Sequence, residues 1–118
     1  MYRMSPNSIM LVFQRANGLN DFVVYAKVTQ TGYNVKVVER DERDPYEKMI
    51  ELPTYEALSD YVDCLINQVA DDRDSDNPFT YLQYNIPMFP AIMVSIDDLR
   101  EDSIAYNNFV AAFDLYFS

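Results

Sequence analysis

Hydrophobic and polar residues alternate along the first forty positions in the way that β-strands require. The segment 9–15 (IMLVFQR) is a continuous apolar run, whereas 22–29 (FVVYAKVT) and 33–39 (YNVKVVE) alternate with a period of two. An Asn-Gly pair at 17–18 and Gly32 lie between these segments, and both supply the positive φ angles that tight hairpins need. The pattern predicts an antiparallel meander.

The segment 46–52 (YEKMIEL) alternates as well and predicts a fourth strand, which Pro53 ends because proline cannot donate to a strand ladder. A helix is then predicted over 54–70, with Thr54 as its N-cap. At about 100° per residue, the apolar residues of this helix fall within one arc and its acidic residues fall opposite. The apolar arc consists of Leu58, Val62, Leu65, Ile66 and Val69, and the opposite side of Glu56, Asp60, Asp63 and Asn67.

Two further strands are predicted at 79–84 and 91–96, separated by NIPMFPA, whose prolines exclude a helix. A second helix begins at about residue 102 or 103. Its core face is predicted to consist of Ala105, Tyr106, Phe109, Val110, Ala112, Phe113, Tyr116 and Phe117. We therefore expect one α+β domain over 1–118. It comprises an antiparallel sheet of about four strands, a packed amphipathic helix, one or two further strands and a C-terminal aromatic helix. The pattern leaves open whether the further strands join the first sheet.

The composition restricts the chemistry available to the chain. Its 118 residues are 49% hydrophobic, enough for a core without metals or disulfides. There is no histidine, which excludes imidazole-based catalysis. The single cysteine, Cys64, lies at the flank of the apolar arc of the first helix, and we expect a packed, inert thiol there, with partial exposure as the alternative. No nucleophile motif is present. We expect a non-enzymatic protein that needs no cofactor.

The net charge of −10 is unevenly distributed, because residues 41–118 hold seventeen of the nineteen acidic side chains and four of the nine basic ones. Such a surface repels nucleic acid and anionic membranes, so a protein with a basic surface is the expected partner, with self-association as the other possibility. The run 9–13 is too short for a signal peptide or a bilayer span. These features predict a soluble, intracellular protein, cytoplasmic or nuclear.

The segment VADDRDSDNPF resembles the start of a calcium-binding loop, with Asp72, Asp74 and Asp76 at its first, third and fifth positions. The twelfth position is Gln83, however, and an amide cannot supply the bidentate carboxylate of such loops. We therefore interpret the segment as a solvated acidic connector, and these three aspartates as a weak cation candidate only.

Apolar residues beyond those needed for the core point to protein binding. In the C-terminal helix, Ile104, Ala111 and Leu115 cluster about 160–180° away from the core face. Met88 and Phe89 lie on the proline-framed loop. The alternative is that the helix is buried on both sides and that Phe89 belongs to the core. Because exposed apolar patches usually mark contacts, we predict a protein-binding or assembly role through these residues.

The acidic side of the first helix offers a second interpretation. On this interpretation Glu56, Asp60 and Asp63 would form a surface that imitates nucleic-acid phosphates, together with the aspartates at 71–76 and the cluster at 97–102. The alternative function is therefore a nucleic-acid mimic that inhibits a basic DNA-binding or RNA-binding protein. A small acidic domain without catalytic motifs is, by composition alone, typical of viral or phage accessory proteins. Simple solubility is the other explanation for the same charges.

Overall fold

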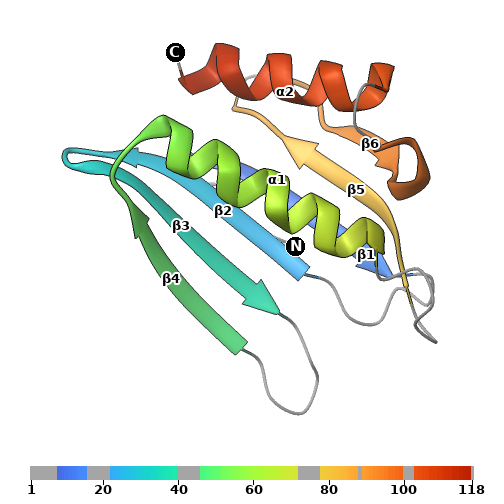
Figure 1. The fold of residues 1–118 in the computed structure, drawn as a ribbon, viewed down its shortest axis with the longest axis horizontal. Helices are drawn as coiled ribbons and strands as arrows, with labels where there is room; N and C mark the ends of the chain where they lie inside the picture. Colours follow the sequence, from blue (N-terminus) through green and yellow to red (C-terminus); the bar gives the residue numbers. More distant parts are fainter. Residues whose placement is uncertain are drawn as a thin grey trace.

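The computed structural model describes residues 8–15, 22–39, 46–71, 78–87, 89–99 and 103–117. Within them the chain forms six strands, two α-helices and a short 3-10 helix (Figure 1). The strands are β1 (Ser8–Arg15), β2 (Phe22–Thr29), β3 (Gly32–Glu39), β4 (Tyr46–Leu52), β5 (Phe79–Asn85) and β6 (Ile92–Ser95). The helices are α1 (Tyr55–Asp71), η2 (Ile96–Asp98) and α2 (Ile104–Phe117). The predicted α+β class is confirmed.

All six strands belong to one antiparallel sheet of order β4-β3-β2-β1-β5-β6. The first four follow chain order, so the predicted meander is confirmed. The two further strands join this sheet next to β1, a placement that the sequence pattern left open. Since β4 and β5 run in the same direction, α1 carries the chain back across one face of the sheet between them (Figure 1).

The β2–β3 turn depends on Gly32, which has a φ of 151°. Residues with a side chain rarely adopt this conformation. A β-carbon at this position would also collide with the carbonyl oxygen of Leu52 at the end of β4. Gly32 therefore allows the tight turn and the close approach of β4 at the same point.

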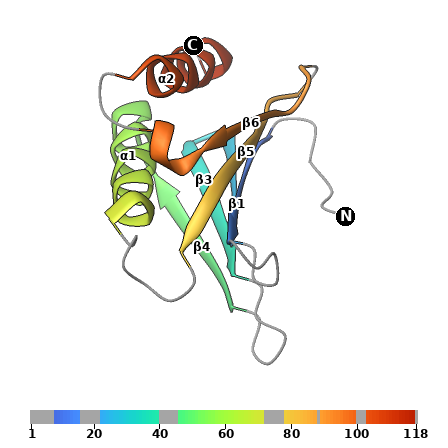
Figure 2. The same cartoon turned by 90° about the vertical axis from the view of Figure 1, so that its right-hand side faces the viewer.

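Both α-helices cover the same face of the sheet (Figure 2). On this face β1 contributes Ile9, Leu11 and Phe13, and α1 contributes its apolar arc. The arc residues Leu58, Val62, Ile66 and Val69 are buried, while Leu65 at its flank is partly buried. From α2 the rings of Phe109 and Phe113 are buried, and the other predicted core residues of that helix are partly buried. The core is thus the one that the helical periodicity predicted.

The central strands β1 and β2 are also buried on the opposite face. Met10, Val12 and Val23 form a second apolar cluster there, with Tyr25 packed against it. This explains why β1 reads as a continuous apolar run and not as an alternating one: its side chains are buried on both sides of the sheet.

Side-chain caps fix the start of both α-helices. The backbone N–H of Ala57 donates to Thr54 Oγ1 at 3.1 Å, as predicted for α1. The N–H of Tyr106 donates to Ser103 Oγ at 3.0 Å and caps α2. The predicted strand 91–96 is shorter than expected, because the chain turns into η2 after Ser95.

No helix in the described parts of the chain is both long and apolar enough to span a bilayer.

Candidate protein-binding surfaces

Helices α1 and α2 lie side by side and antiparallel, joined by two reciprocal tyrosine–aspartate hydrogen bonds. Tyr55 at the start of α1 donates its hydroxyl hydrogen to Asp114 near the end of α2. Tyr106 near the start of α2 donates to Asp63 Oδ1 in α1 at 2.7 Å. Burial and the Asp114 carboxylate together raise the pKa of Tyr55 well above its ordinary value, because both disfavour the phenolate. These bonds fix how the two helices align.

Asp63 is therefore not part of a fully solvated anionic face, as the sequence predicted. Its side chain is half-buried and accepts the hydrogen bond from Tyr106 of α2. The physical reason is that the helical wheel separates a core side from a water side only. Here a second helix lies against the flank of α1 and covers a residue that the wheel assigned to water.

The outward side of α2 carries the predicted second apolar stripe in an exposed position. Ile104 is 82% exposed and Leu115 is 74% exposed, and Ala111 between them is also exposed. Asn108 continues the same line, so the four residues follow the i, i+4, i+7, i+11 spacing of one helix face. We call Ile104, Ala111 and Leu115 the α2 stripe. Its participation in binding remains a prediction.

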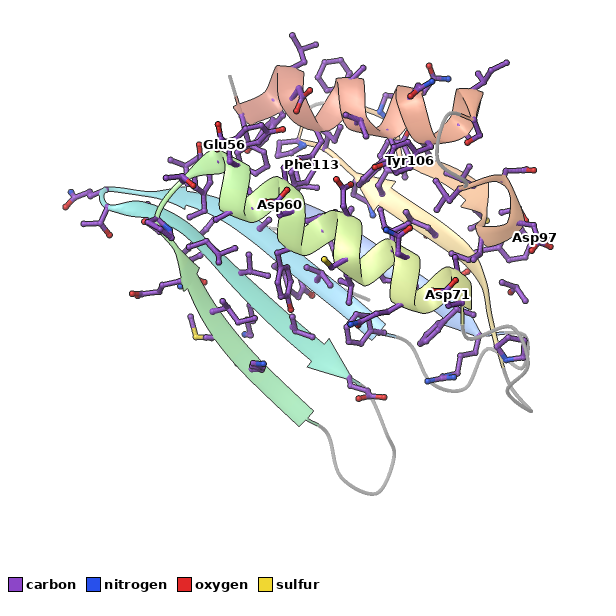
Figure 3. The ribbon with its side chains drawn as sticks, viewed as in Figure 1. Glu56, Asp60, Asp71, Asp97, Tyr106 and Phe113 are labelled. Atoms are coloured by element: carbon purple, nitrogen blue, oxygen red, sulfur yellow. The ribbon has the colours of Figure 1, made fainter. Side chains whose placement is uncertain are left out.

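Of the charged residues, the described helices carry acidic ones only, whereas the described basic residues lie on the sheet. Glu56, Asp60 and Asp71 are exposed along α1, and Asp97 and Asp98 are exposed on η2 (Figure 3). Neither α-helix nor η2 contains a lysine or an arginine. The basic residues of the described ranges lie on β1 to β4: Arg15, Lys27, Lys36 and Lys48. Within the described residues, the helical layer is therefore anionic and contains no lysine or arginine.

A second exposed apolar region lies at the end of the sheet formed by β6. Phe89, in the turn before this strand, is 64% exposed, and Ile92 and Met93 are 46% and 56% exposed. We call these three residues the β6 edge patch. The connection between β5 and β6 projects away from α2 (Figure 2), so the proline loop and the α2 stripe form two separate surfaces. Met88, which we predicted with Phe89, lies outside the described residues.

An open groove of about 480 Å³ lies where the C-terminal end of α1 meets the ends of β1, β2 and β5. Arg15 lies over the ring of Phe79 at 4.0 Å and reaches Glu39 at 4.0 Å. Phe79 also packs against Phe13 and Phe22. The groove is thus lined by an arginine that already has a carboxylate and an aromatic partner, an arrangement typical of a structural contact.

The proposed cation ligands Asp72, Asp74 and Asp76 lie outside the described residues. Among the residues that are described, no three His, Cys, Asp or Glu side chains gather in a way that could hold a metal ion. Cys64 is exposed on α1, so the expectation of a packed thiol is wrong. Cys64 lies just beyond the apolar arc, on a side of α1 that does not face the sheet.

The β6 edge patch is the feature that sequence reasoning missed in part, since Ile92 and Met93 were assigned only to a strand. A signal was present: residues 78–96 contain no charged side chain.

Comparison with known proteins gives no relative from which a function could be transferred. No protein-family model matches the chain, and no curated protein or solved structure does so either.

Proposed function

We propose that the protein is a non-enzymatic binding or assembly protein whose partner docks on the helical layer, with the α2 stripe as its apolar anchor. The observation that carries this proposal is the exposure of Ile104 and Leu115 on a helix whose opposite side already fills the core. A helix that is apolar on both sides is normally buried on both sides. The partner would supply the missing cover.

The stripe has the properties of a binding anchor. A fourteen-residue helix is about 21 Å long, and the stripe runs along most of it. Burying a leucine or isoleucine side chain contributes about 1.5–3 kcal/mol. Docking of a helix face in an apolar groove through residues of this spacing is a common recognition mode. No charge has to be desolvated on the stripe itself, because Asp114 is the only charged residue of α2 and bonds to Tyr55.

The acidic residues of α1 would set the charge of the partner. Glu56 and Asp60 are exposed on the helix that lies directly beside α2. A partner that covers the stripe and extends over α1 meets carboxylates without an opposing lysine or arginine from either helix. Basic residues on the partner would complement them and speed association.

The test compares the wild-type protein with Leu115→Asp and with a matched control, Met49→Asp. Met49 is 61% exposed on β4, and because its neighbour Ile50 packs against the core under the helices, the side chain of Met49 points to the opposite face of the sheet. Each protein is immobilised and incubated with lysate of the source cells, and bound proteins are quantified by mass spectrometry. We expect a specific partner that Leu115→Asp loses at least about tenfold and Met49→Asp retains. Equal partner sets for all three folded proteins would contradict the proposal.

The exposed carboxylates of the described helices support one further candidate, the nucleic-acid mimic. That function requires binding to depend on the exposed carboxylates and not on the stripe. The double variant Glu56→Lys/Asp60→Lys would then abolish binding, and moderate salt would release the partner, because exposed charges are screened within about 8 Å at physiological ionic strength. A partner that resists high salt and is lost with Leu115→Asp excludes the mimic.

A further inference from the structure

The two edge strands of the sheet are protected to different extents. At one edge, β4 carries Glu47, Lys48 and Glu51, and Glu47 forms an ion pair with Lys36 of β3 at 3.1 Å. Charged side chains on an edge strand oppose pairing with a further strand. At the other edge, β6 consists of Ile92, Met93, Val94 and Ser95 and contains no charge. Of the two described edge strands, only β6 consists entirely of uncharged residues.

The uncharged character extends well beyond β6. Residues 78–96 form a run of nineteen positions without Asp, Glu, Lys or Arg, although 24% of the whole chain is charged. This run includes all of β5 and β6 and their connection. The end of the sheet at β6 is therefore electrically neutral in a protein of net charge −10.

Apolar side chains of the β6 edge patch are exposed on both faces of the sheet. Met93 pairs with Gln83 and Ile92 with Tyr84, so the two side chains point to opposite faces. Both are about half exposed, and Phe89 precedes them in the turn closed by its N–H bond to Ile86 O at 3.1 Å. A strand added beside β6 would cover side chains above and below the sheet at once.

We infer that this added strand is β6 of a second copy of the chain, paired antiparallel about a two-fold axis perpendicular to the sheet. In such a pair, one residue of β6 lies opposite the same residue of the second copy. Whether this residue is Met93 or Val94, near the middle of β6, uncharged residues of one copy lie opposite uncharged residues of the other. The two sheets would then form one continuous sheet.

Charge selects a second copy as the occupant. Residues 78–96 contain no carboxylate that could pair with a basic partner. The same segment of a second copy is also uncharged, so pairing the two segments desolvates no charge. Asp97 and Asp98 follow β6 directly. Antiparallel pairing places the aspartates of the two copies at opposite ends of the strand pair, where they repel least, whereas parallel pairing would set them side by side.

This inference does not depend on the proposed function, because the two surfaces share no residue. A pair formed through β6 leaves both α2 stripes exposed for a partner. Since β6 has four residues, the backbone bonds are few, and the apolar side chains supply much of the affinity.

The experiment measures the mass of the full chain by sedimentation equilibrium over protein concentrations of about 1–100 µM. Met93→Lys adds a positive charge near the two-fold axis, where it lies close to the same charge of the second copy. Met49→Lys is the matched control, because Met49 has similar exposure on the opposite edge strand. We expect the wild type and Met49→Lys to form a dimer, and Met93→Lys to raise the dimer dissociation constant at least about tenfold, since like charges opposite each other destabilise a strand pair.

Hydrogen exchange provides a second readout that locates the contact. The amides of Ile92–Ser95 should exchange more slowly at high than at low protein concentration in the wild type, and this difference should disappear in Met93→Lys. A protein that stays monomeric over the whole concentration range would overturn the inference. A dimer that Leu115→Asp dissociates and Met93→Lys leaves intact would overturn it too, because self-association would then use the α2 stripe.

Discussion

Helices α1 and α2 cover the same face of the sheet and contact each other, but their outward sides differ in composition. The outward side of α1 exposes Glu56, Asp60 and Asp71, as expected of a helix that separates core from water. The outward side of α2 exposes Ile104, Ala111 and Leu115. Both helices bury enough on their inner sides to hold them on the sheet.

The fold requires the inward residues of both helices, but it does not require the outward apolar residues of α2. Removing an inward residue of either helix would cost core burial, whereas the outward apolar residues of α2 add little to the stability of the isolated chain. Apolar groups exposed to water without a gain in packing are unfavourable unless something else covers them. The contrast between the two helices is therefore our reason to propose the α2 stripe as the apolar anchor of a binding surface and the acidic side of α1 as the part that would set the partner's charge.

The largest expected effect is the difference in the free energy of unfolding between replacing an inward leucine and replacing an outward one. Leu58 of α1 is fully buried, so Leu58→Ala should lower the free energy of unfolding by about 2–5 kcal/mol through lost burial and a residual cavity. Leu115→Ala on the outside of α2 should change it by less than about 0.5 kcal/mol. Urea unfolding measures both. A cost above about 2 kcal/mol for Leu115→Ala would mean that the α2 stripe supports the core.

High pH should weaken the contact between the two helices. Since the pKa of Tyr55 is raised in the folded chain, the folded state keeps this proton at pH values where the unfolded state, with a tyrosine pKa near 10.0, releases it. The stabilisation is complete below pH 10 and is lost as the pH rises above it, by at most about 1.4 kcal/mol per pH unit for this group.

Tyr55→Phe should make the free energy of unfolding fall less steeply above about pH 10. Burial also raises the pKa of Tyr84 and of Tyr116, so part of the decline should persist in this variant. Tyr81→Phe on β5 controls for the loss of a tyrosine hydroxyl elsewhere. Denaturation curves at several alkaline pH values give the slopes, and identical slopes for the wild type and Tyr55→Phe would show that the Tyr55–Asp114 bond does not couple the helices.

The smallest expected effects concern the two helix caps. Thr54→Ala removes one capping bond from α1 and should cost about 1 kcal/mol. Ser103→Ala should cost more, up to about 2 kcal/mol, because the Ser103 hydroxyl also donates to the carbonyl oxygen of Asp98 at 2.6 Å and so links η2 to α2. Thermal unfolding compares each with its conservative variant, Thr54→Ser or Ser103→Thr. If the variants that keep a hydroxyl cost as much as those that lose it, the caps do not stabilise these helices.

Much of the fold could be predicted because its signals are local. The meander followed from period-two alternation and from Gly32, whose φ of 151° no residue with a side chain adopts easily. Helix α1 was expected over 54–70 with Thr54 as its cap, and it extends over Tyr55–Asp71. Predicted strand 91–96 was too long, because an apolar run does not reveal where the backbone leaves the sheet.

The candidate surfaces were predicted less completely. Ile104, Ala111 and Leu115 could be found from helical angle alone, since their direction depends only on position within one helix. The exposure of Ile92 and Met93 depends on β6 being the last strand of the sheet, which no local pattern states. Asp63 was misplaced because its partner, Tyr106, lies 43 positions away in the sequence.

By itself the sequence determined the type of the six strands and of both α-helices, the side that each α-helix turns to the core and the concentration of acidic residues after position 40. These properties follow from the repeat of a single strand or helix and need no neighbour. Tertiary structure alone decided that β5 pairs with β1, that α2 lies against the flank of α1 and that β6 is the last strand of the described sheet. Each of these features depends on which elements, distant in the sequence, contact each other in space. Such contacts are selected by the apolar surface that is buried when the layers pack together, and no single segment contains that information.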